Sequence, residues 1–255
     1  MTTEQIRAML LEVQQGKLPI EVAVQQFGTP SVGDLGFAQV DLERRVRCGF
    51  PEVIFCEGKT PAWTEGVVRR LVEAQQDCLG TRVNDEQATH LARCFPQAEQ
   101  DRVARTFWLP TSAERPPTIG RVFVVTAGTG DIPVAREAYV TAKVMGTEVE
   151  LVADVGVAGL HRILRQRQAI AQADAIVVCA GMDGALPSVV GGLADCPVIA
   201  VPTSIGYGTA FHGVAPLLTM LNACAANVCV VNIDAGFKGG YIAALIARNS
   251  RKKGE

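Results

Sequence analysis

The sequence lacks several features that would assign a protein to a class at once. Its formal net charge at pH 7 is only −2, so we expect no basic surface for nucleic acid. Its apolar stretches are broken by charge, glycine or proline before they reach membrane-spanning length. The first residues, MTTEQIRAML, show no basic region followed by an apolar core, and we expect no signal peptide. These absences predict a cytoplasmic protein with neither a nucleic-acid nor a membrane partner.

Three common motifs are also missing. The eight cysteines form no Cys-x-x-Cys pair, which argues against a zinc knuckle and suits free thiols in a reducing compartment. No loop matches G-x-G-x-x-G with an acid about 20 residues later, so a standard hydride-transfer dinucleotide fold is disfavoured. Gly58-Lys59-Thr60 resembles the end of a P-loop, but Val53 stands where that motif needs its first glycine. Lys59 remains either an anion partner or a solvated loop lysine.

Composition divides the chain into three parts. Residues 1–34 predict a helical leader, which Gly16 and Pro19 interrupt. Residues 35–113 predict a small α/β domain with strands at Glu52–Cys56, Thr81–Asn84 and Thr106–Leu109 and helices at Trp63–Gln75 and Asp85–Cys94. The stretch ERPPT at 114–118 indicates a linker, because its two prolines continue neither a helix nor a ladder. Residues 119–255 form the third part.

The third part alternates regularly between short apolar runs and segments of helical length. Strands are expected at 122–126, 149–153, 175–180, 197–201 and 228–232, and helices at 134–146, 160–173, 184–194, 213–224 and 239–249. Helical crossovers between apolar strands require parallel neighbours with helices on both faces. The sequence therefore predicts an α/β fold with a doubly wound parallel sheet.

The first strand of this part leads into a loop with marked chemical features. Val122–Pro133 reads VFVVTAGTGDIP, a buried strand followed by a glycine-broken loop that opens a helix. Ligands bind at this edge of open α/β sheets, and Gly128 and Gly130 would let the backbone approach an anion closely. Asp131 adds a carboxylate there. It predicts either a proton-transfer or metal role, or a simple cap for the helix that follows.

Other polar residues allow two interpretations each. The remaining loops at the carboxyl ends of the strands are also rich in glycine, which indicates a cleft for an extended, partly anionic small molecule. Arg44 and Arg47 would share a helical face, as anion ligands or as a solvated surface. Cys224, in the segment NACAAN, would ordinarily be a buried inert thiol, although His212 upstream could activate one. Its helix ends at the rim opposite those loops, so the thiol would need a broken helix or a neighbouring subunit to reach the cleft.

Long ordered motifs give a resemblance to a known family. VVTAGTGDIPVAREA, DVGVAGLHR, AGMDGALPSVVGGL, VPTSIGYGTAFHG, LLTMLNACA and VVNIDAGFKGG, with GFPEVIFCEGKT upstream, resemble the LarB family from about residue 35 to the end. LarB proteins are pyridinium-3,5-biscarboxylic acid mononucleotide synthases of nickel-pincer cofactor assembly. The carboxyl-terminal half is also similar, more distantly, to the class I PurE carboxylases of aminoimidazole ribonucleotide. This resemblance implies a flavodoxin-like sheet and a homo-oligomer, an octamer in PurE, with shared active sites.

The resemblance implies a carboxylation reaction. Nicotinic acid adenine dinucleotide would be carboxylated by carbon dioxide at ring carbon 5, and hydrolysis of its phosphoanhydride would release AMP. An electron-poor pyridinium cannot attack carbon dioxide, but addition of a thiolate at carbon 4 makes carbon 5 nucleophilic. The family carries this cysteine on the motif that ends here in Cys224, which the resemblance makes the expected nucleophile. Mg²⁺ is the implied cofactor, since it would shield the pyrophosphate during hydrolysis.

The resemblance also assigns roles to other residues. Asp131 would take the carbon 5 proton or hold a metal, and Asp154 with Arg162 would face the ring carboxylate and the phosphates. The remaining implied substrate contacts are Thr129, Gly130, Met182, Asp183 and Ser204 on the rim loops and Arg44, Arg47, Lys59 and Thr60 on the small domain. The metal ligands are not assigned.

Departures from the family patterns keep alternatives open. The family often has serine where this chain has Gly130, so a hydroxyl contact is missing or comes from Thr129. PurE enzymes have a histidine before the Leu-Pro of the third loop, where this chain has Ala185. Their second-loop histidine has no direct equivalent, because His161 falls later, on a helix. A PurE-like carboxylase or mutase is therefore disfavoured, and a non-catalytic nucleotide-binding assembly module is the third hypothesis.

Overall fold

The computed structural model describes residues 3–27, 32–112 and 117–252. It divides into two compact units, Met1–Glu99 with Phe107–Thr111 and Gln100–Thr106 with Ser112–Glu255. None of the described helices is long and apolar enough to cross a membrane. The division at 1–34, 35–113 and 119–255 stays a prediction, and part of its linker, 113–116, lies outside the described residues.

The larger unit is built on a five-stranded sheet, which confirms the expected doubly wound fold. In chain order the strands are β7 (Arg121–Thr126), β8 (Glu148–Val152), β9 (Ala175–Ala180), β10 (Val198–Pro202) and β11 (Val228–Val230). They lie in the order β11-β10-β9-β7-β8, and every neighbouring pair is parallel. This is the flavodoxin-like order, in which the chain reverses direction across the sheet beside its first strand. All five strands therefore end at the same edge.

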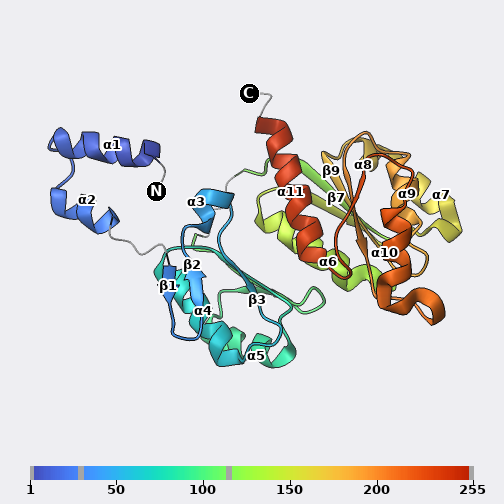
Figure 1. The fold of residues 1–255 in the computed structure, drawn as a ribbon, viewed down its shortest axis with the longest axis horizontal. Coiled ribbons are helices and arrows are strands. Elements are labelled where there is room, and N and C mark those ends of the chain that lie inside the picture. Colours follow the sequence, from blue (N-terminus) through green and yellow to red (C-terminus); the bar gives the residue numbers. More distant parts are fainter. Residues whose placement is uncertain (1–2, 28–31, 113–116, 253–255) are drawn as a thin grey trace. The chain divides into compact units, whose positions relative to one another are not determined.

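Two long helices cover one face of this sheet. α6 (Ile132–Val144) and α11 (Gly236–Lys252) lie side by side there (Figure 1). Their contact is lined by small residues: a Cβ added at Gly240 would lie 2.3 Å from the carbonyl oxygen of Ala138, and one at Gly236 would lie 2.2 Å from that of Val134. Larger side chains at these positions would force the two backbones apart. The small apolar residues of these helices thus bring them into close contact.

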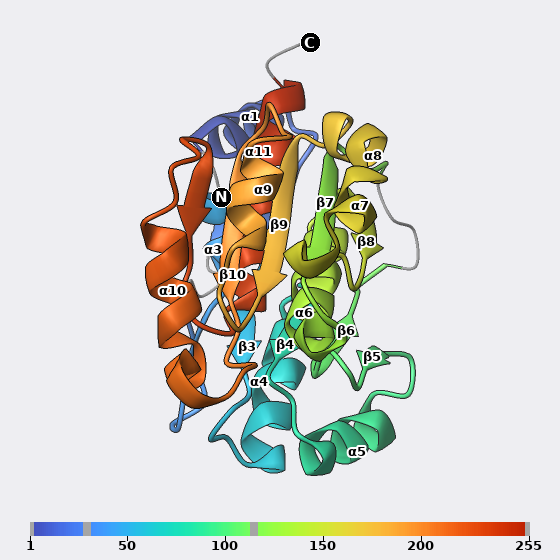
Figure 2. The same cartoon turned by 90° about the vertical axis from the view of Figure 1, so that its right-hand side faces the viewer.

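The opposite face carries shorter helices over an apolar core. These are α7 (Leu160–Leu164), α8 (Arg167–Ala171), α9 (Leu186–Gly191) and α10 (Val214–Leu221). Ile163, Ile170, Leu186 and Met220 from these helices pack with strand residues such as Phe123 in one buried cluster. Figure 2 shows α9 in front of the strands and α11 behind them. The loops that follow the carboxyl ends of the strands leave the sheet at the edge between these two layers of helices.

The single helix expected at 160–173 is wrong, because the structure has two. The amide of Gln166 donates to the carbonyl of Ile163, an i to i−3 bond that tightens the turn between α7 and α8. Ile163 and Ile170 both remain buried, so the break keeps the apolar face on the sheet.

The smaller unit combines helices with two small sheets. α1 (Thr3–Gln14) and α2 (Ile20–Phe27) are separated at Gly16 and Pro19, as expected. β1 (Val32–Asp34) and β2 (Gln39–Asp41) pair antiparallel and precede the short helix α3 (Arg44–Cys48). The main sheet has the order β3-β4-β6-β5. Its elements are β3 (Val53–Phe55), α4 (Pro61–Glu73), β4 (Cys78–Thr81), α5 (Asp85–Cys94), β5 (Glu99–Asp101) and β6 (Thr106–Leu109).

The strand expected at Thr81–Asn84 is displaced toward the amino terminus. The structure places β4 at Cys78–Thr81, and Arg82 then adopts a left-handed conformation with φ of 56° that leads the chain out of the sheet. Gly80 lies inside the strand, where an added Cβ would meet the Cys56 sulfur at 3.2 Å. A close neighbour of this kind explains a glycine in a strand interior, which the residue pattern alone disfavours.

Candidate active site

The loops at the carboxyl edge of the larger sheet leave some of the predicted residues exposed and bury others. After β7, a single 3-10 turn, η1 (Thr129–Asp131), exposes Thr129 and Gly130 to solvent. A Cβ added at Gly130 would approach the Ile205 side chain at 3.0 Å, so the loop after β10 lies directly against this turn. Asp131, the last residue of the turn, is only 3% exposed. The turn thus presents an open backbone above a buried carboxyl.

Asp131 is held by hydrogen bonds on both oxygens. Its Oδ2 accepts from the Gly128 amide at 2.9 Å, and its Oδ1 accepts from the Thr203 hydroxyl at 2.6 Å. Burial raises the pKa of this carboxyl, and the hydrogen bonds from Thr203 and Gly128 only partly oppose the rise. Capping and proton exchange are therefore compatible at this residue: the carboxyl closes its own turn, and its raised pKa brings it nearer to the range where acids exchange protons at neutral pH.

The loop after β10 contributes Thr203 rather than Ser204 to this network. The Thr203 side chain is fully buried, whereas Ser204 contributes its backbone amide, which donates to Asp234 Oδ1 at 2.8 Å. Sequence reasoning missed both Thr203 and Asp234. Their positions in the sequence could have indicated them. Thr203 directly follows β10 and Asp234 comes shortly after β11, and both strands end at this edge.

Asp154 and Arg162, which follow β8, pair with each other. Arg162 Nη1 lies 2.9 Å from Asp154 Oδ2 and donates to the Asp154 carbonyl at 2.6 Å. The Asp154 amide donates to the Thr126 hydroxyl at 3.0 Å, which ties this loop to the end of β7. The resemblance placed both residues at the substrate. The structure brings them together at the predicted edge, with the guanidinium fixed by the carboxylate and by backbone.

The loop after β9 passes close to the loop after β10. A Cβ added at Gly181 would lie 2.2 Å from the Ile205 carbonyl oxygen, so only glycine fits there. Next to it, the Met182 amide donates to that same oxygen at 2.9 Å, and its side chain is about half exposed. Asp183 is exposed and accepts a hydrogen bond from the Ala185 amide. Met182 and Gly130 thus both lie against Ile205 at this edge, and the substrate contacts assigned to Met182 and Asp183 stay a prediction.

Left-handed backbone is concentrated along this edge. Asp154, Met182 and Asp234 have φ between 54° and 60°, and Phe211 and His212 follow with φ of 44° and 50°. Bulky residues seldom adopt this conformation, and such strain is found most often at ligand sites. Phe211 is also 66% exposed, in the loop η3 (Gly208–Gly213) that precedes α10. This concentration of left-handed residues agrees with the edge that the sequence predicts for ligand binding.

Cys224 lies at the opposite edge of the sheet. It follows the end of α10 and precedes β11 by a few residues. In the same segment, the Asn227 side-chain amide donates to the carbonyls of Gly191, Ala194 and Cys196, where α9 has ended and β10 is about to begin. A strand such as β10, with 5 residues, spans about 16 Å. Within one chain the exposed Cys224 thiol is therefore separated from Asp131 by the length of the sheet.

Lys59 and Thr60 in the smaller unit lie at the start of α4. The Lys59 ammonium donates to the Phe55 carbonyl at 2.5 Å and lies 5.9 Å from the centre of the Phe55 ring. The Thr60 hydroxyl accepts from the Trp63 amide at 3.2 Å and caps the helix. Trp63 stacks on Phe37, and both rings are nearly half exposed. An exposed aromatic pair thus lies beside the two predicted anion contacts.

Arg44 and Arg47 lie on α3 in different surroundings. Arg47 forms an exposed ion pair with Asp41. That hydrogen bond is the main cause that holds the pKa of Asp41 below its ordinary value. Arg44 is half-buried, and its charge opposes the burial that raises the pKa of Glu52. Both arginines therefore have acidic neighbours in this unit, Asp41 for Arg47 and Glu52 for Arg44.

Comparisons with known proteins find two family models, a protein relative and a solved structure. A family model described as the LarB/PurE-like N-terminal domain matches residues 32–111, and one described as AIR carboxylase matches residues 121–254. A protein of Methanocaldococcus jannaschii, described as uncharacterised, is 39% identical over 221 residues, or 84% of this chain and 85% of that protein. A crystal structure of a PurE2 variant from Treponema denticola covers 53% of this chain and 81% of its own, with 19% identity and a TM-score of 0.40.

The two matched domains follow one another along a single chain, and the second spans more than half of it. The larger unit thus carries a carboxylase-family domain, and the domain that precedes it is the one described for LarB. On this evidence the protein belongs to the LarB family.

Proposed function

We propose that the protein carboxylates the pyridinium ring of nicotinic acid adenine dinucleotide and hydrolyses its phosphoanhydride. The products would be AMP and pyridinium-3,5-biscarboxylic acid mononucleotide, which serves nickel-pincer cofactor assembly. The observation that carries the proposal is the LarB-type domain in front of the carboxylase-family domain. The buried, protonatable Asp131 at the strained rim supports it, because the reaction must remove a ring proton after carboxylation.

The proposed reaction is redox-neutral and needs no external oxidant. The Cys224 thiolate adds to ring carbon 4, which neutralises the pyridinium and makes carbon 5 enamine-like. Carbon 5 attacks carbon dioxide and forms the new carbon–carbon bond. A base then takes the carbon 5 proton, the electron pair restores the aromatic ring, and the thiolate leaves from carbon 4. Water attacks the phosphoanhydride in a separate hydrolysis that releases AMP.

The rim residues then take distinct roles. Asp131 accepts the carbon 5 proton, which a carboxyl with a raised pKa can hold once transferred. Asp154 orients the Arg162 guanidinium, whose remaining donors suit a carboxylate or phosphate of the substrate. The exposed loop positions Thr129, Gly130, Met182 and Asp183, with the half-buried Ser204, complete the substrate surface.

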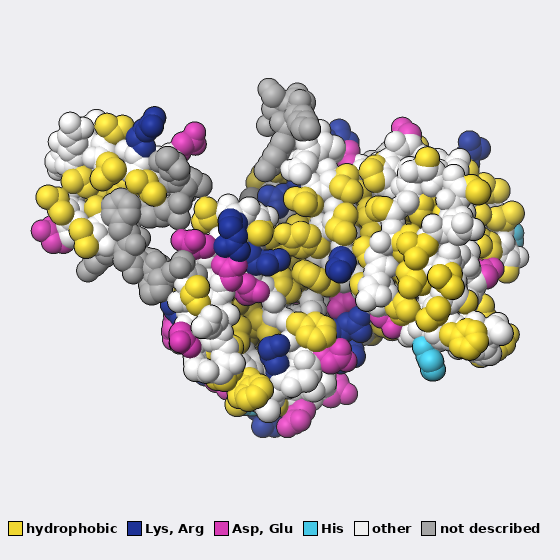
Figure 3. All heavy atoms as spheres, in the orientation of Figure 1, with side chains coloured by type: hydrophobic (Ala, Val, Ile, Leu, Met, Phe, Trp, Pro, Cys, Tyr) yellow, Lys and Arg dark blue, Asp and Glu magenta, His cyan; other side chains and the backbone are white. Residues whose placement is uncertain are grey.

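A second copy of the chain supplies Cys224 in this proposal. The thiol and Asp131 lie at opposite edges of one sheet, so one chain cannot bring both to the same ring. The helix before Cys224, α10, exposes Val214, Leu218 and Leu221 at helical spacing, and Figure 3 shows hydrophobic side chains gathered over it. An exposed apolar surface of this kind is typical of an interface between subunits. It would carry Cys224 to the rim of a neighbour in a homo-oligomer, for which an octamer is one candidate.

Mg²⁺ is proposed as a substrate-borne ion. Among the residues that the structure describes, no three acid, histidine or cysteine ligands converge at the rim. Mg²⁺ is commonly held by one or two carboxylates together with substrate phosphates, and the exposed Asp183 fits that mode. When bound, the ion would neutralise charge on the phosphoanhydride.

The smaller unit offers candidate contacts for the adenosine diphosphate portion. Arg44, Lys59 and Thr60 are proposed for its phosphates, with Arg47 as a weaker candidate because of its pairing with Asp41. The exposed Phe37–Trp63 pair suits stacking on a purine. This stacking can be tested by itself: AMP should quench the fluorescence of Trp63, and the quenching should be lost in Phe37→Ala.

The test of the proposed function is a product assay by mass spectrometry. The purified protein is incubated with nicotinic acid adenine dinucleotide, bicarbonate and Mg²⁺, beside Cys224→Ala and a matched control, Cys229→Ala, which removes another exposed cysteine. We expect AMP and the dicarboxylated mononucleotide from the wild type and the control only. Product from Cys224→Ala would remove the nucleophile assignment. No product from any variant, while the dinucleotide still binds, would favour a non-catalytic nucleotide-binding module.

Mixing two inactive variants tests the shared site. Cys224→Ala retains Asp131, and Asp131→Asn retains Cys224. If each site takes the two residues from different chains, mixed oligomers rebuild some intact sites and recover activity. Recovery in the mixture, absent from either variant alone, supports the second copy, whereas an active monomer would exclude it.

A second candidate is a PurE-like aminoimidazole ribonucleotide carboxylase or mutase. The match of residues 121–254 to the AIR carboxylase model favours it. Ala185 stands where such enzymes have a histidine, and His161 lies exposed on α7, which disfavours it. Incubation with aminoimidazole ribonucleotide and bicarbonate in the same assay separates the two candidates by product mass.

A further inference from the structure

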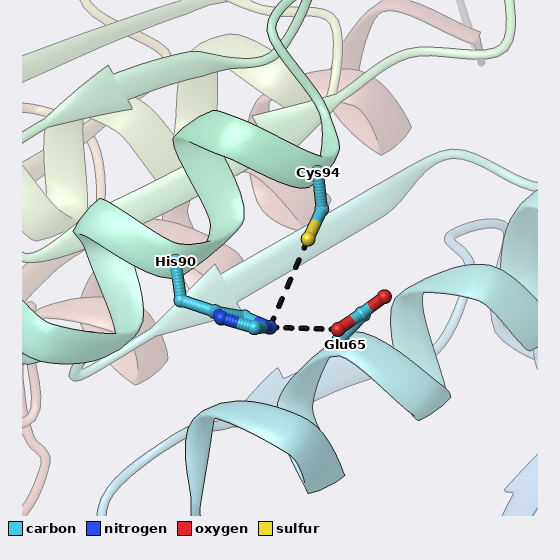
Figure 4. Close-up of side chains that lie close together, drawn as sticks. All are labelled: Glu65, His90 and Cys94. Carbon is cyan, nitrogen blue, oxygen red and sulfur yellow. Dashed lines mark hydrogen bonds and ion pairs between the residues drawn. The ribbon is translucent and has the colours of Figure 1, made fainter.

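Three potential metal ligands of different chemistry meet between two helices of the smaller unit. Glu65 lies on α4, and His90 and Cys94 lie on α5. His90 Nε2 is 2.7 Å from Glu65 Oε2 and 3.7 Å from the Cys94 sulfur, and the three ligand atoms all lie within 4.8 Å of one another. Figure 4 shows the imidazole between the carboxylate and the thiol, with both contacts made to the same nitrogen. All three residues are half-buried.

The helices place these ligands by ordinary spacing. His90 and Cys94 are four residues apart, so they share one face of α5, and that face is opposed by Glu65 of α4. Zinc binds cysteine sulfur at about 2.3 Å and histidine nitrogen at about 2.0–2.1 Å, which separates the two ligand atoms by about 3.5 Å in a tetrahedral site. The observed separation of 3.7 Å already matches this value. The carboxylate oxygen would need to move away from the imidazole by only about 0.6 Å.

The surroundings prepare the site for a cation. Arg69 holds the other carboxylate oxygen, Glu65 Oε1, at 2.6–2.7 Å, and leaves Oε2 directed at His90. Outer partners of this kind commonly orient carboxylate ligands. A surface hollow of about 520 Å³ reaches His90 from solvent, and Asp85, Glu86 and Arg93 also line it.

We propose that Glu65, His90 and Cys94 bind one divalent transition-metal ion of the zinc class, separate from the carboxylase-family domain. His90 binds the ion through Nε2 as a neutral imidazole with its proton on Nδ1, and the Cys94 thiol releases its proton to solvent as the sulfur–metal bond forms. Three protein ligands leave a fourth position for water or another small ligand. The mixed sulfur, nitrogen and oxygen set favours zinc or cobalt over Mg²⁺, which prefers oxygen ligands throughout.

Cobalt absorption tests the site directly. The full-length protein is reduced, freed of metal and titrated with Co²⁺, because a cobalt–thiolate bond gives a near-ultraviolet charge-transfer band that oxygen and nitrogen ligands do not give. We expect a band that saturates at a single equivalent and is displaced by Zn²⁺. Cys94→Ser should abolish it, and His90→Gln, which can still donate to Glu65, should weaken binding at least tenfold. Cys48→Ser, another half-buried cysteine, is the matched control and should retain the band.

Two results would overturn the proposal. One is an undiminished band in Cys94→Ser, which would place the thiolate elsewhere, and the other is a wild-type protein that takes up no stoichiometric cobalt. Circular dichroism of each variant checks the fold. If Cys94→Ser is unfolded, Glu65→Gln takes its place, since it preserves size and the Arg69 side while removing the anionic ligand; retention of wild-type affinity in that variant would equally refute the site.

Discussion

Replacing Thr203 by valine is expected to destabilise the larger unit, and to do so more strongly at neutral than at acid pH. The Thr203 hydroxyl is fully buried and donates to Asp131 at 2.6 Å. A hydrogen bond to a charged group contributes about 1.5–3 kcal/mol and one to a neutral group about 0.5–1.5 kcal/mol. We therefore expect a loss of about 2 kcal/mol while Asp131 is ionised and about 1 kcal/mol once it is protonated.

The direction of the pH dependence follows from the pKa of Asp131. Burial raises it above 3.8 in the folded state, so the folded protein holds the proton more tightly than the unfolded chain. This tighter proton binding stabilises the folded protein fully below pH 3.8, and the stabilisation is lost as the pH rises through the folded pKa of Asp131. The Thr203 hydrogen bond lowers the pKa, so its removal raises the folded pKa further. The additional loss in Thr203→Val thus shrinks as the pH falls through this interval.

Urea unfolding measured by two probes isolates the effect. Both tryptophans, Trp63 and Trp108, lie in the smaller unit, so tryptophan fluorescence reports that unit while far-ultraviolet circular dichroism also includes the larger one. Thr203→Val should shift the dichroism transition and leave the fluorescence transition in place. Thr203→Ser keeps the hydroxyl and loses a buried methyl, at about 0.8 kcal/mol that does not depend on pH. Equal shifts for both variants at every pH would refute the reasoning.

Three further changes have distinct expected outcomes. Asp131→Asn can still accept a hydrogen bond from one donor, so it should lower the carboxylation rate about 10²- to 10⁴-fold with little loss of stability. Asp131→Ala leaves two buried donors unpaired and should also lower the unfolding free energy by about 1–3 kcal/mol. A product assay beside urea unfolding separates the two effects. Gly181→Ala would place a Cβ 2.2 Å from a carbonyl oxygen and should lower the unfolding free energy by about 1–3 kcal/mol. Gly192→Ala, whose added Cβ has its nearest neighbour at 3.6 Å, should leave the unfolding free energy unchanged. Equal denaturation midpoints for the two variants would contradict this. Leu218→Glu on α10 should dissociate the proposed oligomer in light-scattering chromatography, and Leu245→Glu on α11, also exposed, should not; an unchanged mass for Leu218→Glu would exclude α10 from the interface.

The sequence was sufficient to predict the framework of the larger unit. Its central strands β7, β9 and β10 are nearly continuous apolar runs because both faces are covered, and each strand of the sheet is separated from the next by a crossover of helical length. The same regularity located the rim, since parallel strands must all end at one edge. Short elements were harder: β1 and β2 have 3 residues each, which is too few for any periodicity to show. β4 was misplaced because its glycine weakens the strand pattern.

The side-chain partners at the rim could not be predicted in the same way. The hydrogen bond between Thr203 and Asp131 joins residues 72 positions apart, and no local pattern distinguishes Thr203 from Ser204 as the donor. The pairing of Asp154 with Arg162 was closer in sequence, but the expectation that both face the substrate overlooked their mutual attraction. The position of Cys224 at the far edge, in contrast, followed from topology alone, because a crossover helix runs back to the start of the next strand.

The contact between α6 and α11 has a consequence for how the larger unit is made. The Glu137 carboxylate accepts a hydrogen bond from the Phe237 amide, 100 residues later in the chain, at the start of α11. Ribosomes add about 5–20 residues per second, so α6 waits about 5–20 s for its partner after it is synthesised. During that interval its small apolar face and the adjacent strands have no cover from α11. The domain therefore completes its fold only after nearly all of it has been synthesised.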